Sequence, residues 1–414
     1  MDPGISVSLD PAFALQSLAF VLGGALLGTL SGLTPGLHAN NFALILAGMA
    51  PLMPGPPLLV GAAMLSAGVV HTFLDVVPAL ALGVPDAEMA VAALPGHRLV
   101  LDGRGYEALR LSAMGSALAV VFAVPLAVPV TLVMVELWPT LVEHMPLVLG
   151  CVVVIMLLTE TTLSGLVGGL LAFGTSALLG TTALDLDPAA PLYGDILAPL
   201  FAGLFGAPIL IDAMGGSGIP EQTVDTITIP RQAVLLPAAA GALAGAVVGY
   251  LPGVSSAIAA VLALLALPGS SGDRGFVIAT SGVNTANTIF ALFAFVALGA
   301  PRTGVLVAVE RAEVPLNLPV LLSAVAIAAA IGFVLVLVVG DWYLRVISTL
   351  DYMKLCLVIL ALLVVLSYVF AGAIGIVVFS VSAIVGFIPV RFGANRVHLM
   401  GVLIGPIALF YYGI

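Results

Sequence analysis

The chain of 414 residues is 62% hydrophobic and only 8% charged, with a mean hydropathy of +1.27 and a formal net charge of −10. Soluble globular proteins carry roughly 25% charged residues, so this composition excludes an ordinary soluble protein. The small number of basic residues, 11 Lys and Arg, also excludes a nucleic-acid-binding protein. We therefore expect an all-α, multi-pass protein of the cell membrane. The first ten residues lack the basic segment of a cleavable signal peptide, so we expect the first apolar segment to remain as an anchor.

A membrane-spanning helix needs about 20 apolar residues, and apolar segments come in two sets of seven on either side of a polar stretch. The first set lies at residues 12–33, 39–53, 57–83, 109–137, 144–160, 162–181 and 192–213. The second set lies at residues 232–251, 254–268, 275–299, 318–340, 353–371, 372–390 and 396–413. The pattern predicts an N-terminal membrane repeat (residues 1–214), a polar linker (215–231) and a C-terminal membrane repeat (232–414).

Two short motifs recur at a nearly constant spacing and indicate that the chain is duplicated. Pro35-Gly36 recurs as Pro252-Gly253, 217 positions later. Gly83-Val84-Pro85 recurs as Gly299-Ala300-Pro301, 216 positions later. A difference of one residue over about fifty is difficult to obtain by chance, so we expect two structurally similar repeats.

The apolar segment after each Pro-Gly pair is too short to cross the membrane as a straight helix. About 15 residues span roughly 22 Å, against a hydrocarbon core of about 30 Å. Paired short segments with Gly and Pro interruptions in two halves point to a transporter binding site. Proline and glycine interrupt helices, and broken backbone inside the membrane must be buried in protein or line a cavity. The alternative is that each pair ends a helix at the membrane surface. We favour inverted repeats, although re-entrant short segments would leave the two halves free to be parallel.

Polar residues follow each Pro-Gly pair at the start of the next apolar segment. The unpaired N–H groups at a helix N-terminus form a ready anion site, which neighbouring polar side chains extend; the alternative is that these side chains only cap the helix. The candidate substrate-binding residues are Pro35, Gly36, His38, Asn40, Asn41, Pro252, Gly253, Ser255 and Ser256.

A second polar cluster lies inside apolar segments. His71 and Asp75 are four residues apart and therefore share a helical face, and an ionisable pair inside the membrane is a functional candidate because its burial is costly. When the two repeats are aligned by the recurring motifs, His71-Thr72 of the first repeat corresponds to Asn287-Thr288 of the second. These residues predict a site for a coupling cation, Na⁺ or H⁺; a pair that only joins two helices is the alternative. The candidate coupling residues are His71, Thr72, Asp75, Ser281, Asn284, Asn287 and Thr288.

The remaining polar residues give no sign of catalysis. The sequence has no nucleophile elbow, no phosphate-binding loop and no His-Glu-x-x-His motif, so we expect no enzyme, no catalytic residue, no structural metal and no cofactor. We interpret Glu160, His97, His144 and His398 as residues at the membrane interface because they lie near segment ends. Cys151 and Cys356 lie in separate apolar runs and predict no disulfide.

Five segments together resemble a known family. They are Gly32-Leu33-Thr34-Pro35-Gly36-Leu37-His38-Ala39-Asn40, Gly83-Val84-Pro85-Asp86-Ala87-Glu88-Met89-Ala90, Asp102-Gly103-Arg104-Gly105-Tyr106-Glu107-Ala108-Leu109, Ala202-Gly203-Leu204-Phe205-Gly206 and Met400-Gly401-Val402-Leu403-Ile404-Gly405-Pro406. The chain is similar to the large membrane subunit of tripartite tricarboxylate transporters, the TctA family. His38 stands where the family has glycine, and the chain is shorter than usual, so it resembles a divergent archaeal-type branch.

The resemblance implies a secondary transporter of two repeats that imports a carboxylate by symport with a cation, with the Pro-Gly loops lining the substrate site. It implies two partners, an extracytoplasmic binding protein and a small membrane subunit; we also consider a homodimer, and expect no nucleic acid. The alternative function is a translocase for polyprenyl phosphate or another anionic lipid carrier, in which the same paired Pro-Gly site holds the phosphate.

Overall fold

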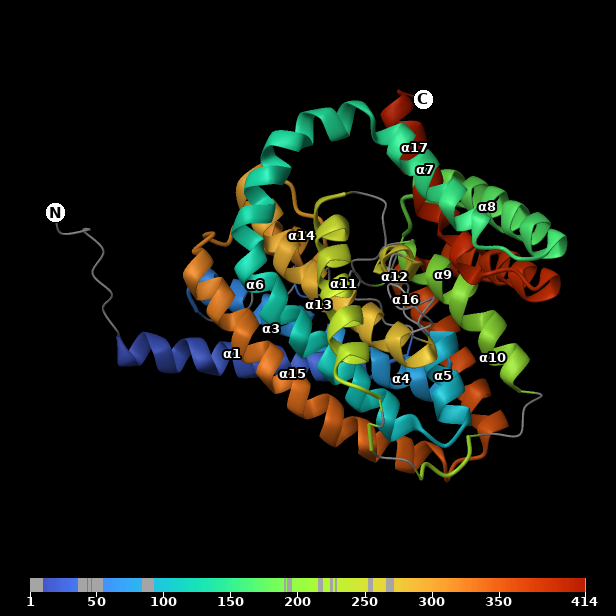
Figure 1. Ribbon diagram of the computed structural model, residues 1–414, viewed down its shortest axis with the longest axis horizontal. Coiled ribbons are helices and arrows are strands. Elements are labelled where there is room, and N and C mark those ends of the chain that lie inside the picture. The colour runs from blue at the N-terminus through green and yellow to red at the C-terminus, as the bar shows by residue number, and fades with distance from the viewer. Residues whose placement is uncertain are drawn as a thin grey trace.

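Figure 1 shows the computed structural model, which is helical throughout the residues that it describes. These are residues 10–35, 43, 46, 55–83, 93–189, 191, 196–214, 219–223, 226–227, 229–251, 256–265 and 272–413. The first half contains α1 (Pro11–Gly32), α3 (Pro57–Leu74), α4 (Val76–Leu82), α5 (Ala93–Leu101), α6 (Gly105–Glu143), α7 (Met145–Leu158), α8 (Leu163–Ala183), α9 (Leu197–Phe201), the π-helix η2 (Ala202–Gly206) and α10 (Ala207–Ala213). The second half contains α11 (Gln232–Tyr250), α12 (Ser256–Leu265), α13 (Gly272–Leu298), α14 (Gly304–Arg311), α15 (Leu318–Ile347), α16 (Tyr352–Phe392), the 3₁₀-helix η3 (Arg396–Met400) and α17 (Gly401–Tyr412).

The multi-pass prediction is confirmed by the length and composition of these helices. Within the described ranges, eight helical segments are long and apolar enough to cross a membrane. Their outward side chains are apolar: Leu15 is 70% exposed on α1 and Leu132 is 66% exposed on α6. The predicted division between residues 371 and 372 is also observed, because Gly372 interrupts α16 with φ 61° and ψ −153°. Of the predicted segment 39–53, only residues 43 and 46 are described.

Two short helices were not predicted from the apolar pattern. Helices α5 and α14 occupy equivalent places after α4 and after α13. Each is under ten residues long and carries charge, with Arg98 in α5 and Glu310 and Arg311 in α14. A search for apolar runs passes over such helices because they lie against the bundle with only one face buried.

Helices α1 and α3 approach each other closely through small residues four positions apart. A Cβ atom added at any of three α1 glycines would collide with α3: Gly24 with Ala63, Gly28 with Ala67 and Gly32 with Leu74. In lipid, where no hydrophobic effect drives helices together, close contact through small residues is a principal source of association. Since successive glycines meet successive turns, α1 and α3 run in the same direction.

Helices α11 and α13 repeat this arrangement. Three glycines of α11 meet α13 at three points in the same chain order: Gly241 with Ala279, Gly245 with Val283 and Gly249 with Phe290. Each glycine lies 217 positions, and each partner 216 positions, after its counterpart in the first pair. The equivalent contacts support the predicted repeats of residues 1–214 and 232–414, which stay a prediction.

The two helix pairs run in opposite directions. The end of the first pair, with α5, lies beside the start of α13, where Arg98 forms an ion pair with Asp273 at 3.2 Å. The start of α3 lies beside the residues that follow α13, because a Cβ atom on Gly61 would meet Val314. Figure 1 shows α5 and α14 on opposite sides of the bundle. Within the described residues, α1 and α3 are thus parallel, whereas α3 and α13 are antiparallel; the arrangement favours the inverted repeats, which stay a prediction.

The buried apolar side chains form two large clusters, and α11, α13 and α16 contribute residues to both. One cluster includes residues of α1, α3, α13 and α15, and the other includes residues of α7, α8, α9 and α17. Helix α6 has 39 residues and three internal prolines, Pro125, Pro129 and Pro139. At 1.5 Å per residue its length is about 58 Å, well beyond the hydrocarbon core. It packs into the first cluster and then arches across to α7 (Figure 1).

The predicted polar linker is attached to the first half by one side chain. Gln222 is 8% exposed; its Oε1 accepts a hydrogen bond from the N–H of Gly105 at 2.6 Å, and its Nε2 donates to the carbonyl of Val100 at 3.0 Å. Gln222 thereby bonds to backbone groups at the turn between α5 and α6, where the N–H of Gly105 has no partner within the helix.

We predict that Gly28→Leu strongly destabilises the protein whereas Gly23→Leu does not. A side chain at Gly28 would collide with the backbone of Ala67, while nothing lies within 4 Å of a Cβ atom at Gly23. Overpacking costs about 1–3 kcal/mol or more. Thermal unfolding of the two purified variants in detergent measures the difference, and equal melting temperatures would contradict the tight α1–α3 contact.

Candidate functional site

The two predicted groups of coupling residues meet where α3 faces α13. Nδ2 of Asn284 donates a hydrogen bond to Oδ2 of Asp75 at 2.9 Å. These residues are 209 positions apart in the sequence and come from different halves of the chain. Asp75 is 4% exposed and Asn284 is fully buried. A carboxylate from the first half thus lies against an amide from the second half.

A third helix holds His71 in the same region. Nδ1 of His71 is 2.9 Å from Oγ of Ser31, near the end of α1, and His71 is 1% exposed. The backbone N–H of Asp75 donates to the carbonyl of His71 at 2.8 Å. Ser31 was not among the predicted residues, although its place in the Pro-Gly segment of α1 was a usable signal.

The other predicted coupling residues are buried but have different contacts. The hydroxyl of Thr72 donates to the carbonyl of Val69, one turn earlier. Ser281 contacts Ser112 of α6, with 2.8 Å between the hydroxyl oxygens. Asn287 and Thr288 are 5% and 8% exposed. Ser281 therefore joins α13 to α6, whereas Thr72 bonds within its own helix.

Several oxygen atoms on α13 lack a hydrogen-bond partner within the described part of the chain. They are Oδ1 of Asn284, Oγ1 of Thr285 and Oδ1 of Asn287. Nδ2 of Asn284 donates to Asp75, and this hydrogen bond fixes the orientation of the amide group. The Oδ1 atom of Asn284 therefore points in one direction as an acceptor. Buried polar atoms are normally satisfied, so such oxygens, close to a carboxylate, suit a ligand that supplies positive charge. Groups of three or more His, Cys, Asp or Glu able to hold a metal ion are absent from the described residues.

Most of the predicted substrate-binding residues cannot be placed. Gly36, His38, Asn40, Asn41, Pro252, Gly253 and Ser255 lie outside the described residues. Pro35 follows α1 directly and is half-buried. Ser256 begins α12, is 1% exposed, and its hydroxyl has no partner among the residues described. The ends of α1 and α11 lie inside the protein, since Gly32 and Gly249 contact α3 and α13.

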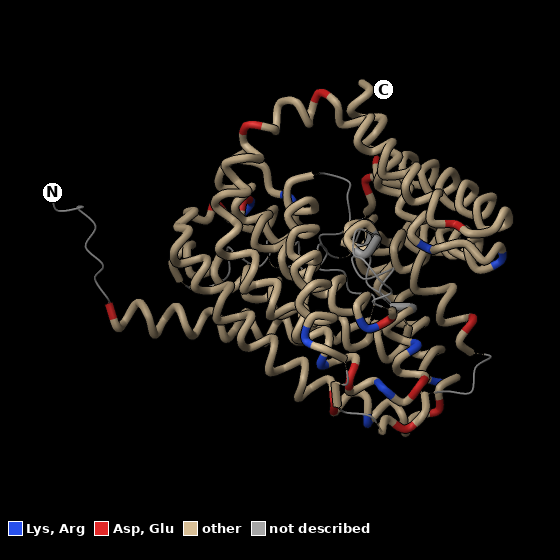
Figure 2. Tube along the Cα trace, viewed as in Figure 1, with Lys and Arg blue, Asp and Glu red and all other residues tan. Residues whose placement is uncertain are grey.

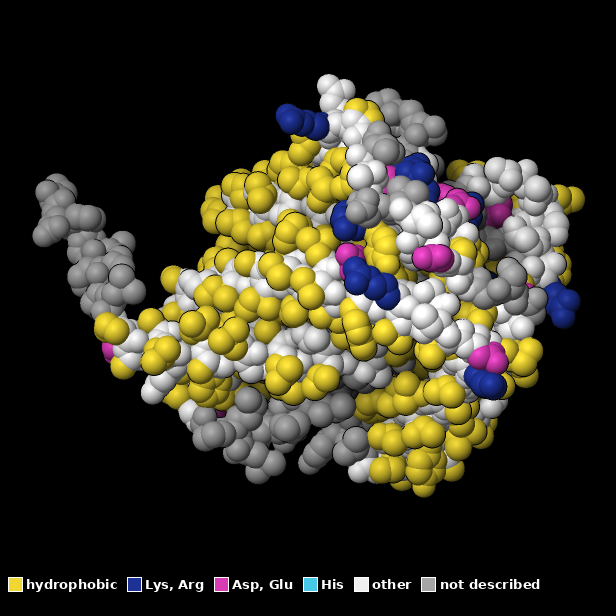
Figure 3. All heavy atoms as spheres, turned by 90° about the horizontal axis from the view of Figure 1, so that it is seen from below, with side chains coloured by type: hydrophobic (Ala, Val, Ile, Leu, Met, Phe, Trp, Pro, Cys, Tyr) yellow, Lys and Arg dark blue, Asp and Glu magenta, His cyan; other side chains and the backbone are white. Residues whose placement is uncertain are grey.

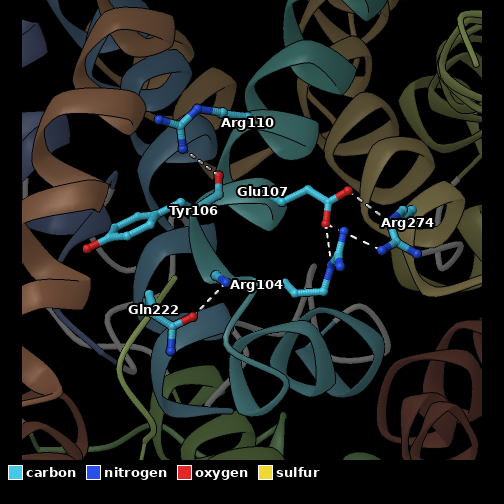
Figure 4. A network of polar contacts seen from close by, with 7 residues as sticks. Arg104, Tyr106, Glu107, Arg110, Gln222 and Arg274 are labelled. Atoms are coloured by element: carbon cyan, nitrogen blue, oxygen red, sulfur yellow. Dashed lines mark hydrogen bonds and ion pairs between the residues drawn. The ribbon is translucent and has the colours of Figure 1, made fainter. Parts of the chain in front are cut away.

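A carboxylate that the sequence analysis did not single out lies between two arginines (Figure 4). Glu107, in the first turn of α6, is fully buried. Nε of Arg104 is 2.6 Å from its Oε2, and Nε of Arg274, in the first turn of α13, is 2.9 Å from its Oε1. Because Arg274 belongs to the second half, Glu107 connects the two halves. The hydrogen bond to Glu107 raises the pKa of Arg104 above its usual value. The local signal was the Arg104–Glu107 spacing of three residues.

A second buried pair corrects our interpretation of His398 and Glu160 as interfacial residues. Nε2 of His398 is 2.8 Å from Oε1 of Glu160, and their side chains are only 1% and 5% exposed. The same oxygen accepts the backbone N–H of Asn395 at 2.7 Å. Both residues are near helix ends, as predicted, but these ends pack against each other rather than against the headgroups. His97 is also half-buried; its Nδ1 lies 2.8 Å from the carbonyl of Leu80, and burial lowers its pKa.

Eight long apolar helices among the described residues, with ionisable side chains buried between them, define a multi-pass membrane protein. The chain belongs to the tripartite tricarboxylate transporter TctA family, whose model matches residues 18–401. Membership makes it a membrane subunit of a transporter. The chain is 26% identical over 408 residues to an uncharacterized protein, MJ1079, of Methanocaldococcus jannaschii. The matched region covers 96% of this chain and 99% of that protein. No solved structure matches the chain.

We predict that Glu107→Gln lowers the free energy of unfolding by an amount on the order of 2 kcal/mol, because it leaves two arginines on a neutral amide. Asp351→Asn is the matched control, since it removes an exposed ion pair with Lys354, and such pairs contribute little. Chemical denaturation of both variants gives the comparison. Equal stability of the two would show that Glu107 contributes no more than a surface charge.

Proposed function

We propose that this chain is the large membrane subunit of a secondary transporter that moves a carboxylate-type organic anion across the cell membrane, coupled to a cation gradient. Membership of the TctA family supports transport of this class. The observation that carries the coupling is the buried contact of Asp75 with Asn284. Ionisable residues are kept in the interior of a membrane bundle at considerable cost, and ion pathways are a common reason for keeping them.

The substrate is proposed to bind between the paired helix breaks at Pro35-Gly36 and Pro252-Gly253. The N-terminus of α12 presents unpaired N–H groups and the positive end of a helix dipole, together with the hydroxyl of Ser256. His38, Asn40 and Asn41 supply the donors of the first half, and Ser255 adds to those of the second. Each of two carboxylates of one substrate would then bind at one of the two helix breaks.

The coupling cation is proposed to bind beside Asp75. Helix α1 ends near this residue, and the C-terminal end of a helix carries partial negative charge and free carbonyl groups. In transporters with broken helices, such ends coordinate Na⁺ or H⁺. The amide and hydroxyl oxygens of Asn284, Thr285 and Asn287 are ligands suited to a hard cation, which favours Na⁺. The remaining candidates, His71, Thr72, Ser281 and Thr288, would position these ligands.

Two partners belong to the proposal because the family is tripartite. They are an extracytoplasmic binding protein that delivers the substrate and a small membrane subunit that completes the transporter. A homodimer of the large subunit is compatible with both.

We predict that citrate or a related di- or tricarboxylate raises the melting temperature of the purified chain. A ligand that binds only the folded state adds about 1.4 kcal/mol of stability for each tenfold rise in concentration above its Kd. Short polyprenyl phosphates are tested in parallel. Stabilisation by the lipid phosphates alone would favour the alternative lipid-carrier function, and stabilisation by none of these anions would contradict an anion site at the helix breaks.

We also predict that Na⁺ stabilises the protein and that Asn284→Leu abolishes this effect. Leucine has nearly the size of asparagine but no oxygen ligand. Ser382→Ala is the matched control, because Ser382 of α16 is also fully buried with an unpartnered hydroxyl within the described residues. The melting temperature is measured against NaCl and against KCl at constant ionic strength. Equal shifts with both salts, or an unchanged Na⁺ shift in Asn284→Leu, would argue against this cation site.

A further inference from the structure

The contacts between helices define two opposite faces of the bundle. We call the first the arginine-rich face: it comprises α5, the starts of α6, α11 and α13, the end of α15 and the start of α16. Ion pairs connect these elements, namely Arg98–Asp273, Arg104–Glu107–Arg274 and Arg110–Asp341. The start of α11 belongs with them because α11 and α13 run in the same direction.

The second face, the α14 face, comprises α14, the starts of α1 and α3, and the far ends of α6 and α13. Val305 and Val314 lie where a Cβ atom on Gly68 or Gly61 of α3 would meet them. The guanidinium of Arg302 lies 4.6 Å from the ring centroid of Trp138, near the end of α6. Helix α1 starts on this face as well, since it is parallel to α3.

The basic residues are distributed very unequally between the two faces. All 11 Lys and Arg lie in the described residues. The arginine-rich face carries Arg98, Arg104, Arg110, Arg231, Arg274, Arg345 and Lys354, whereas the α14 face carries Arg302 and Arg311. Arg391 and Arg396, at the end of α16 and the start of η3, are left out of both counts. Figure 2 shows most Lys and Arg at the lower edge of the molecule, and Figure 3, seen from below, shows them grouped with acidic residues amid apolar surface.

We infer that the arginine-rich face is cytoplasmic and the α14 face is extracytoplasmic. Short cytoplasmic connections of membrane proteins are enriched in Lys and Arg, and Asp and Glu contribute little to this rule. The many carboxylates that pair with the arginines therefore do not weaken the assignment. Seven basic residues against two is a strong asymmetry for short connections. The inference does not depend on the transported substrate or on the coupling ion.

This orientation fixes how the chain enters the membrane. Helix α1 enters from outside at Asp10 and ends within the bundle before Pro35. Helix α11 enters from the cytoplasm at Arg231 and ends within the bundle at Tyr250. The two helix breaks are therefore approached from opposite sides of the membrane.

Labelling of single cysteines in intact bacterial cells tests the orientation. The background carries Cys151→Ala and Cys356→Ala, which remove both native cysteines, and must remain unlabelled. Asp102→Cys places a thiol at an exposed position on the arginine-rich face, and Glu310→Cys places one at an exposed position of α14. Neither residue belongs to the proposed substrate or coupling sites.

A membrane-impermeant maleimide is expected to label Glu310→Cys in intact cells and Asp102→Cys only after the membrane is permeabilised. Labelling of Asp102→Cys alone in intact cells would reverse the orientation, and labelling of both would show that the chain has no single orientation. Failure to label either variant after permeabilisation would contradict the exposure of these positions on the two faces.

Discussion

The structure depends on one constraint: inside a membrane, every backbone polar group must find its partner within the protein. A helix that ends in the interior exposes up to four carbonyls or N–H groups, so protein must surround its end. Here the glycine contacts of α1 with α3, and of α11 with α13, bring a neighbouring helix against each of the two interior ends. The close packing therefore makes broken helices tolerable at the depth where Asp75, His71 and Asn284 lie.

The two halves repeat the same packing but carry different chemistry. In the register of the glycine contacts, His71 corresponds to Asn287, and Asp75 corresponds to Ala291. One half thus supplies ionisable groups and the other supplies amides, and the antiparallel arrangement of α3 and α13 brings them together. The polar contact therefore combines residues of both halves, and neither half contains it alone.

Much of the helical architecture followed from apolar runs, because the bilayer sets a minimum length and excludes charge. The division of α16 at Gly372 was predictable for the same reason, whereas the contact of Asp75 with Asn284 was not predicted, although both residues were candidates. Helices α5 and α14 were not, because amphipathic helices of under ten residues produce no apolar run. The ion pairs of Glu107 with Arg274, and of Glu160 with His398, join residues more than 160 positions apart. A local sequence pattern does not predict a partner at such a distance. The Pro-Gly sites themselves fall largely outside the described residues and stay predictions.

Helix α6 runs from the first apolar cluster to the start of α7 over a length of about 58 Å. Each proline in its interior lacks an N–H group, so a carbonyl one turn earlier has no helical hydrogen bond. Pro125, Pro129 and Pro139 lie in the later half of the helix, where it leaves the first cluster and approaches α7. Bending there breaks fewer hydrogen bonds than bending elsewhere along the helix. The helix is thus most readily bent in its later half, away from its first turn, where Glu107 is held by Arg104 and Arg274.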